Sequence, residues 1–459
     1  MNSPTRPDLL TLILVGTFFW TSLDLYAQVV PGEQDDPRPL SFLDTGIVEP
    51  PQDSSRAAQP APFEFLNSLV EEALRLNPSI HSARRKWAAS TKTPSQVASL
   101  PNPEVSFSSM SSGNLLPYST IGNGPLSWAS FMFMQKIPWP GKLSLKRDIA
   151  ETEAAQHAQR YQAVTLNTVG QLKAAYFDVG YADQATGILN RHLDLLQKFS
   201  KIAEAKYTVG ESLLADVLRS QVEISLIWER LELLNQQRES AQARINTLLN
   251  RSPDVVLPQV DQVEDTSVEL PFSLERLYLI AREQNPEIET ERLEIQKASL
   301  QVDLARKKFF PDLNLSTTYM LRGGPFDNMY EYRAGVEIPL YFWKKERFGV
   351  EQSVEEVERS KYDYQSKLQE VTFKIKDAYI QARTARTLVR LYRQGIIPQA
   401  TASLDSALSA YEVGSLGFLA LIDNALTVLN YELQYEEETR DYFQGLVRLE
   451  ELLGFVFVR

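Results

Sequence analysis

Side chains that could perform chemistry are few in this chain of 459 residues. It contains no cysteine, which excludes disulfides, thiolate metal ligands and a cysteine nucleophile. Its three histidines, His81, His157 and His192, are widely separated and do not form a ligand spacing such as His-Glu-x-x-His. No glycine-rich phosphate-binding loop is present either. We therefore predict that the protein is not an enzyme and holds no cofactor.

Methionine offers a ligand chemistry of its own, because thioether sulfur is a soft ligand that suits Cu(I). Four of the six methionines fall in segments of alternating polarity. By analogy with the clearest of these segments, these four methionines are expected on the same strand face as Lys136. They are Met110, Met132, Met134 and Met320. A soft-metal site is one interpretation, and simple filling of irregular space is the other. The sequence leaves both open, and no metal site is firm.

The segments that carry these methionines are predicted to be strands. The clearest run from Asp312 to Leu321 and from Tyr330 to Leu340, where apolar and polar residues alternate. An earlier pair begins at Glu104 and ends near Gln135. Alternation over about ten residues predicts a half-buried strand, and ten residues is also what a tilted strand needs to cross a bilayer. A sandwich strand with one wet face fits each segment equally well.

The sequence also predicts long helices, which would position these strands. No proline occurs between Pro140 and Pro253. The residues there predict one helix from about Lys142 to Tyr207 and a second from about Ser212 to Leu249, with a tight turn between them. At 1.5 Å per residue the first would be on the order of 100 Å long. Apolar residues in the second keep a seven-residue rhythm, which implies a left-handed supercoil.

A second pair of long helices is predicted from about Glu346 to Tyr411 and from Phe418 to Leu453. Pro398 lies inside the first of these, and we expect a kink or break there because proline cannot donate a backbone hydrogen bond. The pair recurs because the chain repeats itself at an offset of roughly two hundred residues.

The repeated landmarks keep one order along the chain. They are Asn77-Pro78 and Asn285-Pro286, Lys173-Ala-Ala-Tyr176 and Lys376-Asp-Ala-Tyr379, Tyr207-Thr-Val-Gly210 and Tyr411-Glu-Val-Gly414, and Leu248-Leu249 and Leu452-Leu453. We therefore predict two internal repeats that each contain a helix, two strands and two long helices. The predicted divisions are a first repeat (63–255), a linker (256–270), a second repeat (271–454) and a C-terminal tail (455–459).

The first residues have the pattern of a targeting segment. Arg6 precedes an apolar run from Leu9 to Trp20, and the small residue Ala27 suits a cleavage site, so we predict a signal peptide over 1–27. Many prolines among polar residues predict a disordered linker over 28–62. The net charge of −12, without a basic stripe, argues against a nucleic-acid partner.

Four strands per chain are too few to close a barrel, and an open sheet has edges that lipid does not tolerate. Three chains of four strands give twelve, an ordinary number for a barrel with apolar residues facing lipid and polar residues facing a water-filled lumen. We therefore predict a mixed α and β membrane protein. In this architecture three chains close a 12-stranded membrane β-barrel, and the long helices pack on both sides, as in a cylinder of helices.

This arrangement resembles the TolC-type outer-membrane efflux protein family over nearly the whole of residues 63–454. The resemblance rests on the duplicated element order, Pro-Asn-Pro-Glu104, the segment Gln135-Lys-Ile-Pro-Trp-Pro-Gly-Lys142 and the two Tyr-x-Val-Gly turns. It implies a passive homotrimeric conduit in a Gram-negative bacterium, in which a 12-stranded outer-membrane β-barrel is continued by a long α-helical coiled-coil barrel in the periplasm. Its partners would be outer-membrane lipid, a periplasmic adaptor protein and an inner-membrane pump, for which the resistance-nodulation-division type is one candidate.

The resemblance also assigns roles to particular residues. The turns at Val209-Gly210 and Val413-Gly414 resemble the hairpin tips that meet the adaptor, although glycine there also fits a simple helix-ending turn. Asp423 lies where the family often has an acidic ring at the periplasmic gate, while Ala420 stands where a second acidic residue is common. A solvated residue on the helix surface is the alternative interpretation of Asp423. Type I protein secretion and a soluble coiled-coil scaffold are the alternative functions.

Overall fold

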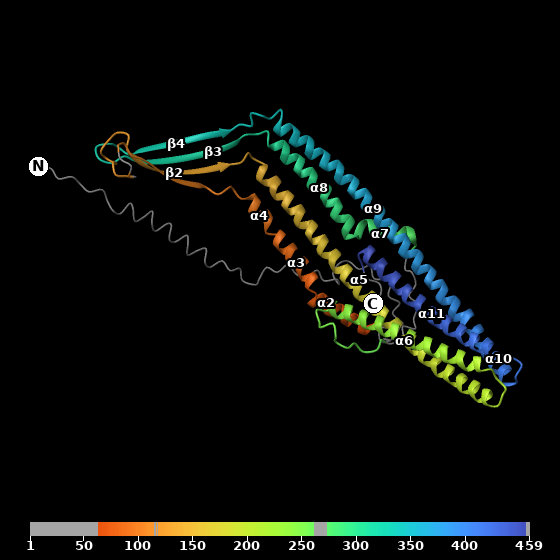
Figure 1. The fold of residues 1–459 in the computed structure, drawn as a ribbon. Helices are drawn as coiled ribbons and strands as arrows, with labels where there is room; N and C mark the ends of the chain where they lie inside the picture. The colour runs from red at the N-terminus through yellow and green to blue at the C-terminus, as the bar shows by residue number, and fades with distance from the viewer. Residues whose placement is uncertain (1–62, 114–115, 117, 261–272, 456–459) are drawn as a thin grey trace, which may run out of the picture. The chain divides into compact units, whose positions relative to one another are not determined.

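The structure is a computed structural model that describes residues 63–113, 116, 118–260 and 273–455. The predicted signal peptide (1–27) and proline-rich linker (28–62) lie outside the described residues. Most of the predicted inter-repeat linker and of the C-terminal tail does so as well. The described residues contain both long helices and a sheet, which confirms the predicted mixture of α and β structure (Figure 1).

Along the chain there are two pairs of strands, and helices come before and after each pair. In chain order they are α2 (Glu64–Leu76), α3 (Pro78–Ser90), α4 (Thr93–Ala98), α5 (Lys142–Thr208), α6 (Leu214–Leu248), α7 (Leu274–Gln284), α8 (Pro286–Lys307), α9 (Lys345–Leu391), α10 (Ile397–Glu412) and α11 (Phe418–Leu453). Within the described residues, no helix combines the length and the apolar composition needed to span a membrane.

Four antiparallel strands form one sheet in the order β1-β2-β3-β4. They are β1 (Glu104–Met110), β2 (Trp128–Ile137), β3 (Asp312–Leu321) and β4 (Met329–Glu337). The central pairing joins the two halves of the chain, because β2 pairs with β3. β4 ends at Glu337, three residues earlier than predicted, because Pro339 has no N–H to contribute to the ladder.

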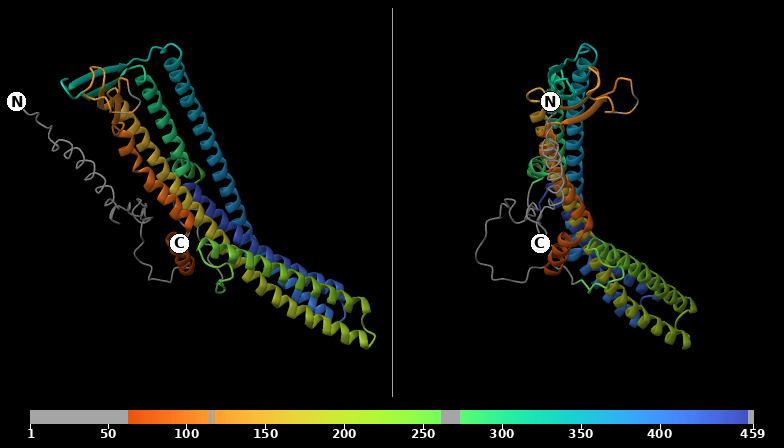
Figure 2. Two further views of the ribbon diagram at one scale, coloured as in Figure 1. Left: turned by 60° about the vertical axis from the view of Figure 1, so that its left-hand side comes forward. Right: turned by 90° about the vertical axis from the view of Figure 1, so that its left-hand side faces the viewer.

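The long helices agree closely with the predicted ranges. α5 begins at Lys142 as predicted and packs along α6, α8 and α11. The predicted break near Pro398 is confirmed: α9 ends at Leu391, a π-helical turn (η1) covers Tyr392–Ile396, and α10 begins at Ile397. Figure 2 shows the sheet at one end of the helices and the turns between α5 and α6 and between α10 and α11 at the other.

Three apolar clusters hold the helices together. One joins α2, α5, α6, α9 and α11, and the rings of Phe177 and Phe443 stack within it with their centroids 4.8 Å apart. A second fills the space between the α5–α6 and α10–α11 hairpins, and a third joins α7, α8, α9 and α11. Lys173 and Glu450 form an ion pair of 2.6 Å between α5 and α11, with only 1% and 5% of their side chains exposed. Such a pair requires both helices to keep their positions.

Two equivalent asparagines end one helix and begin the next. The Asn77 side chain accepts hydrogen bonds from the N–H groups of Ser79 and Ile80 and donates to the Leu248 carbonyl. Asn285 does the same with Glu287, Ile288 and Leu452. Each amide therefore caps a helix and satisfies a carbonyl at the end of another helix.

We predict that Asn285→Ala lowers the free energy of unfolding by about 1–2 kcal/mol, because the cap and the bond to the Leu452 carbonyl are both lost. Thermal unfolding of the detergent-solubilised protein measures the effect. Asn235→Ala is the matched control, since Asn235 is an exposed residue bonded only along its own helix to Glu239. Equal melting temperatures for the two variants would contradict the prediction.

Candidate functional site

The sheet has two chemically different faces. Its register places most of the apolar residues on one side, called the apolar face below: Val105, Phe107, Ala129, Phe131, Phe133, Ile137, Leu313, Leu315, Tyr319, Leu321, Tyr330, Tyr332, Ala334 and Val336. The other side, the polar face, carries Ser106, Ser108, Ser130, Lys136, Asp312, Asn314, Ser316, Thr318, Glu331, Arg333 and Glu337.

The apolar face is largely uncovered in a single chain. Phe131 on a central strand is 53% exposed, and Tyr332 on an edge strand is 80% exposed. A continuous apolar surface of this size marks an interaction with a membrane or another protein. The face therefore requires an apolar environment that one chain does not provide.

Aromatic residues gather where the strands meet the helices. The rings of Trp139 and Phe310 stack with centroids 5.2 Å apart, and those of Phe342 and Trp343 meet edge to face at the same distance. Phe309 joins Phe342 at 6.4 Å. Aromatic rings are enriched at the two borders of the membrane in proteins that span it. This group was not predicted from the sequence, although the run Tyr341-Phe342-Trp343 was a signal for it.

Asp312 fixes the start of β3 to the segment that follows β2. Its Oδ1 atom accepts hydrogen bonds from the Trp139 backbone N–H at 2.9 Å and from Lys142 Nζ at 2.7 Å. Lys136 on β2 pairs with Glu337 on β4 and lies 3.8 Å from Asp312. These contacts join the sheet to the first turn of α5, so the sheet and the longest helix hold a fixed relative position.

The four methionines selected from the sequence lie on the polar face. The register aligns Met132 with Ser106 and Thr318, and Met320 with Ser130. It also adds a methionine that the sequence analysis missed, because Met329 at the start of β4 lies directly opposite Met320. In the part of the chain that the structure describes, no three His, Asp or Glu residues gather into a group able to hold a metal ion.

Both predicted hairpin tips end a helix in the same way. Gly210 and Gly414 have positive φ angles of 83° and 75°, and an added Cβ atom at either would meet open space. The N–H of the following residue bonds back to Lys206 or Ala410. Val209 and Val413 precede the glycines and are 70% and 80% exposed. The tips thus present apolar side chains on tight, well-defined turns.

A contact between the two hairpins lies next to the tips. Lys206 Nζ donates a hydrogen bond of 3.3 Å to the Tyr411 carbonyl and lies 4.1 Å from the centroid of its ring. Tyr411 is 5% exposed, whereas Tyr207, its counterpart in the first half, is 44% exposed. Burial, followed by the nearby charge of Asp216, raises the pKa of Tyr411. Similar sequences therefore have different surroundings at the two tips.

Asp423 lies on an exposed polar stripe of α11. The members of this stripe follow one another at spacings of three and four residues: Asp423, Thr427, Asn430, Gln434, Glu437 and Asp441. Among the described residues, the Asp423 carboxylate has no ion-pair partner. Ala420, one turn earlier, is half-buried. The structure thus leaves Asp423 accessible to solvent near the hairpin tip.

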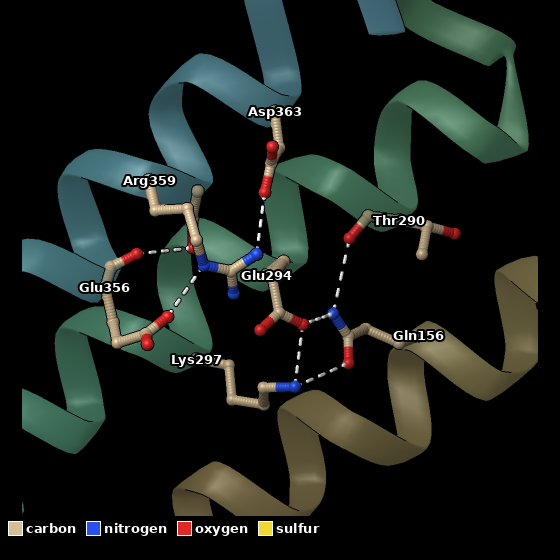
Figure 3. A network of polar contacts seen from close by, with 8 residues as sticks. Gln156, Thr290, Glu294, Lys297, Glu356, Arg359 and Asp363 are labelled. Atoms are coloured by element: carbon tan, nitrogen blue, oxygen red, sulfur yellow. Dashed lines mark hydrogen bonds and ion pairs between the residues drawn. The ribbon is translucent and has the colours of Figure 1, made fainter. Parts of the chain in front are cut away.

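A network of polar side chains joins α5 and α8 beside α9 (Figure 3). Gln156 on α5 donates to Glu294 at 2.8 Å and to the Thr290 carbonyl at 3.3 Å. Lys297 forms an ion pair of 2.7 Å with Glu294. Arg359 on α9 bonds to acidic neighbours on its own helix and faces Glu294 across the gap between the helices. This network was not predicted from the sequence, because its members lie far apart in the chain.

The pKa values of two neighbouring carboxyl groups on α8, those of Glu294 and Glu291, shift in opposite directions. Burial alone would raise the pKa of Glu294, but the hydrogen bonds from Gln156 and Lys297 outweigh it and lower that pKa. Burial raises the pKa of Glu291, and the negative charges of Asp363 and Glu294 add to this effect. Glu294 is therefore stabilised as a carboxylate, and its partners depend on its charge.

The fold is shared with outer-membrane channels of known structure. The chain superposes on CusC, a protein known to form a transmembrane channel, with a TM-score of 0.74 and 17% identity over 88% of this chain and 96% of that chain. It superposes on the MtrE outer membrane channel of Neisseria gonorrhoeae with a TM-score of 0.70 and 17% identity, over 85% and 89% of the two chains.

Relatives and a family profile point to the same class. The outer membrane efflux protein BepC of Brucella suis biovar 1 (strain 1330) is 22% identical over 78% of each chain. The cobalt-zinc-cadmium resistance protein CzcC of Cupriavidus metallidurans is 20% identical over 90% of this chain and 94% of the relative. The profile of the family described as Outer membrane efflux protein matches residues 69–251 and 277–455. This chain belongs to that family, as the sequence resemblance predicted.

We predict that Glu294→Gln lowers thermal stability at neutral pH by roughly 1 kcal/mol, because Lys297 loses its charged partner. A carboxylate whose pKa is lowered by folding stabilises the protein above its ordinary value of 4.5, and this stabilisation is lost as the pH falls below it. The melting temperatures of variant and parent should therefore converge in acid. Glu358→Gln, at an exposed ion pair, is the control. A difference that persists in acid would exclude this role for Glu294.

Proposed function

We propose that the protein is a passive exit channel in the outer membrane of a Gram-negative bacterium and that it assembles as a homotrimer. The observation that carries this proposal is the sheet with one exposed apolar face and two edge strands. Within the described residues, β1 and β4 each pair on one side only. Lipid does not tolerate the unpaired N–H and C=O groups of a sheet edge, so the strands must close into a barrel. Pairing β4 of one chain with β1 of the next in three copies closes a 12-stranded barrel.

An apolar stripe on α9 supports the same assembly. Its exposed members lie on one line along the helix: Phe348, Tyr362, Phe373, Ile380 and Leu391. Their separations of 7, 11 and 14 residues keep one face of an α-helix. A stripe of large apolar side chains requires a covering helix, and the helices of a neighbouring copy would provide it. Helices packed in this way would form the periplasmic coiled-coil barrel that continues the β-barrel.

The polar surfaces define the route through the protein in this proposal. The polar face of the sheet lines the lumen of the barrel, and the polar stripe of α11 lines the helical part. Asp423 from each of three chains would form the periplasmic gate, a negatively charged constriction near the hairpin tips. The two internal repeats, 63–255 and 271–454, each supply two strands and one helical hairpin to this wall. The channel performs no chemistry, and the energy for transport comes from its partners.

We further propose that Val209-Gly210 and Val413-Gly414 meet a periplasmic adaptor protein. The adaptor connects the channel to an inner-membrane pump, for which the resistance-nodulation-division type remains a candidate. Exposed valines on tight turns suit this contact, because they offer apolar surface with little conformational freedom to lose. Export of polypeptides by a type I system would use the same architecture. A soluble scaffold does not account for the exposed apolar face of the sheet.

Adjacent substitutions on β3 test the membrane barrel. We predict that Leu315→Lys, on the apolar face, strongly reduces the amount of trimer in the outer membrane, because a lysine facing lipid at mid-depth costs about 2–4 kcal/mol per chain. Ser316→Lys, on the polar face, should assemble normally. Native mass spectrometry of membrane extracts measures the trimer. Equal losses in the two variants, or a stable monomer without detergent in the parent, would overturn the proposal.

A second prediction concerns the gate. Three carboxylates around one axis should bind a trivalent cation, so hexamminecobalt(III) added from the periplasmic side should block the conductance of single channels in planar bilayers. Asp423→Asn should weaken this block at least about tenfold, because the attraction depends on charge. Asp405→Asn, at an exposed position on α10, should leave it unchanged. An unaltered block in Asp423→Asn would show that Asp423 is a solvated surface residue.

A further inference from the structure

All methionines of the chain except Met1, which lies outside the described residues, are on the polar face of the sheet. Five of the six are there: Met110, Met132, Met134, Met320 and Met329. Among the described strand positions, none on the apolar face is methionine. The three buried clusters that hold the helices together contain no methionine either. In the described residues, methionine is therefore absent from the apolar face and from the buried clusters, where it would serve only to fill space. It occurs instead where the neighbouring residues are Ser, Thr and charged residues.

Four of these methionines occupy adjoining positions. Met320 and Met329 are direct partners across β3 and β4, so their Cβ atoms are about 5 Å apart. Met132 on β2 is the diagonal neighbour of Met320, because Met132 pairs with Thr318, two residues before Met320. The Cβ atoms of Met132 and Met320 are therefore about 7 Å apart. Met134 follows Met132 on the same face, about 7 Å along the strand. The flexible side chains can bring two or three of these sulfur atoms onto one ion.

Met110 shares the face but stands apart from this group. It lies on β1 opposite Trp128, and β2 separates it from Met320 on β3. Two strand spacings amount to about 10 Å, which is too far for the two sulfur atoms to hold one ion without moving the backbone. Met110 therefore provides an internal control for any property that requires neighbouring thioethers.

The surroundings of the four methionines contain few competing ligands. Ser108 and Ser130 are bonded to each other at 2.9 Å, and Glu331 is paired with Arg333 at 2.7 Å. Arg322 Nη1 donates to Met329 Sδ at 3.6 Å, and its Nη2 donates to the Pro125 carbonyl at 2.7 Å. The positive charge of Arg322 next to this sulfur opposes a cation, so Met329 becomes a ligand only when Arg322 moves away.

We infer that Met132, Met134, Met320 and Met329 form a weak, exchangeable site for a soft monovalent cation, Cu(I) or Ag(I), on the wall of the lumen. The inference rests on the proposed channel function for the statement that this face lines a pore, and it narrows the cargo to soft metal ions. Neutral thioethers bind soft ions without supplying negative charge, which limits affinity and permits release. A pore needs such weak binding, because an ion held tightly would not leave.

The absence of titrating ligands has a measurable consequence. Thioether sulfur does not gain or lose a proton in the physiological range, whereas a histidine site would lose affinity as its ring becomes protonated. Binding of Ag(I) to this site should therefore be constant between about pH 5 and pH 8. A clear loss of affinity toward pH 5 would assign the ion to other ligands and overturn the inference.

The full-length protein, labelled with ¹³C at the methionine methyl groups and purified in detergent, provides the direct test. Titration with silver nitrate in chloride-free buffer should shift the methyl signals of Met132, Met134 and Met320 first, while the Met110 signal stays in place. The double variant Met132→Leu/Met320→Leu should weaken Ag(I) binding at least tenfold, and Met110→Leu should not. Leucine for methionine nearly conserves volume, so the sheet should remain folded. Arg322→Gln should strengthen binding, because a positive charge is removed.

Three outcomes would overturn the inference: uniform shifts of all methyl signals, equal shifts with Zn(II), or unchanged affinity in the double variant. Single-channel conductance of the same samples in potassium nitrate separates this test from the proposed function. Channels that conduct but do not bind Ag(I) at these methionines would refute the metal site alone. Protein that binds Ag(I) but forms no channels would refute the channel and leave the thioether cluster as a metal site.

Discussion

The constraint on which the rest of this structure depends is an open sheet with one apolar face. In the described residues, β1 and β4 have backbone groups paired on one side only, and the apolar face is largely exposed. A single chain satisfies neither the hydrogen bonds of the edges nor the apolar surface. In the channel that we propose, closure with further copies in a lipid environment would satisfy both at once. The proposed assembly and membrane insertion would then be two consequences of the same four strands.

The helices connect the sheet to the hairpin tips through a series of charged contacts. α5 begins immediately after the segment that Asp312 holds to the sheet, and it runs without interruption to the first hairpin tip. The network around Glu294 joins α5 to α8 just beyond the sheet, and the buried pair of Lys173 and Glu450 joins α5 to α11 further along. A displacement at the hairpin tips would therefore have to break charged, partly buried contacts before it reached the sheet.

The two halves of the chain are alike where a helix must begin and different where the hairpins meet. Asn77 and Asn285 make the same three kinds of hydrogen bond, because each caps a helix and satisfies a distant carbonyl. Tyr207 and Tyr411, in contrast, have the same place in sequence but opposite exposure. The π-helical turn before Pro398 occurs only in the second half of the described structure. Similar hairpins have thus acquired different neighbours.

Much of the architecture followed from local sequence. Alternation of polarity and helix-forming composition act within a few residues, so they predicted the strands, the long helices and the break at Pro398. Tertiary structure alone decided the pairing of β2 with β3, the place of Met329 opposite Met320, the contact of Lys206 with Tyr411 and the network around Glu294. These features depend on register and packing between distant segments. No local preference specifies them, because their free energy arises only when the segments meet.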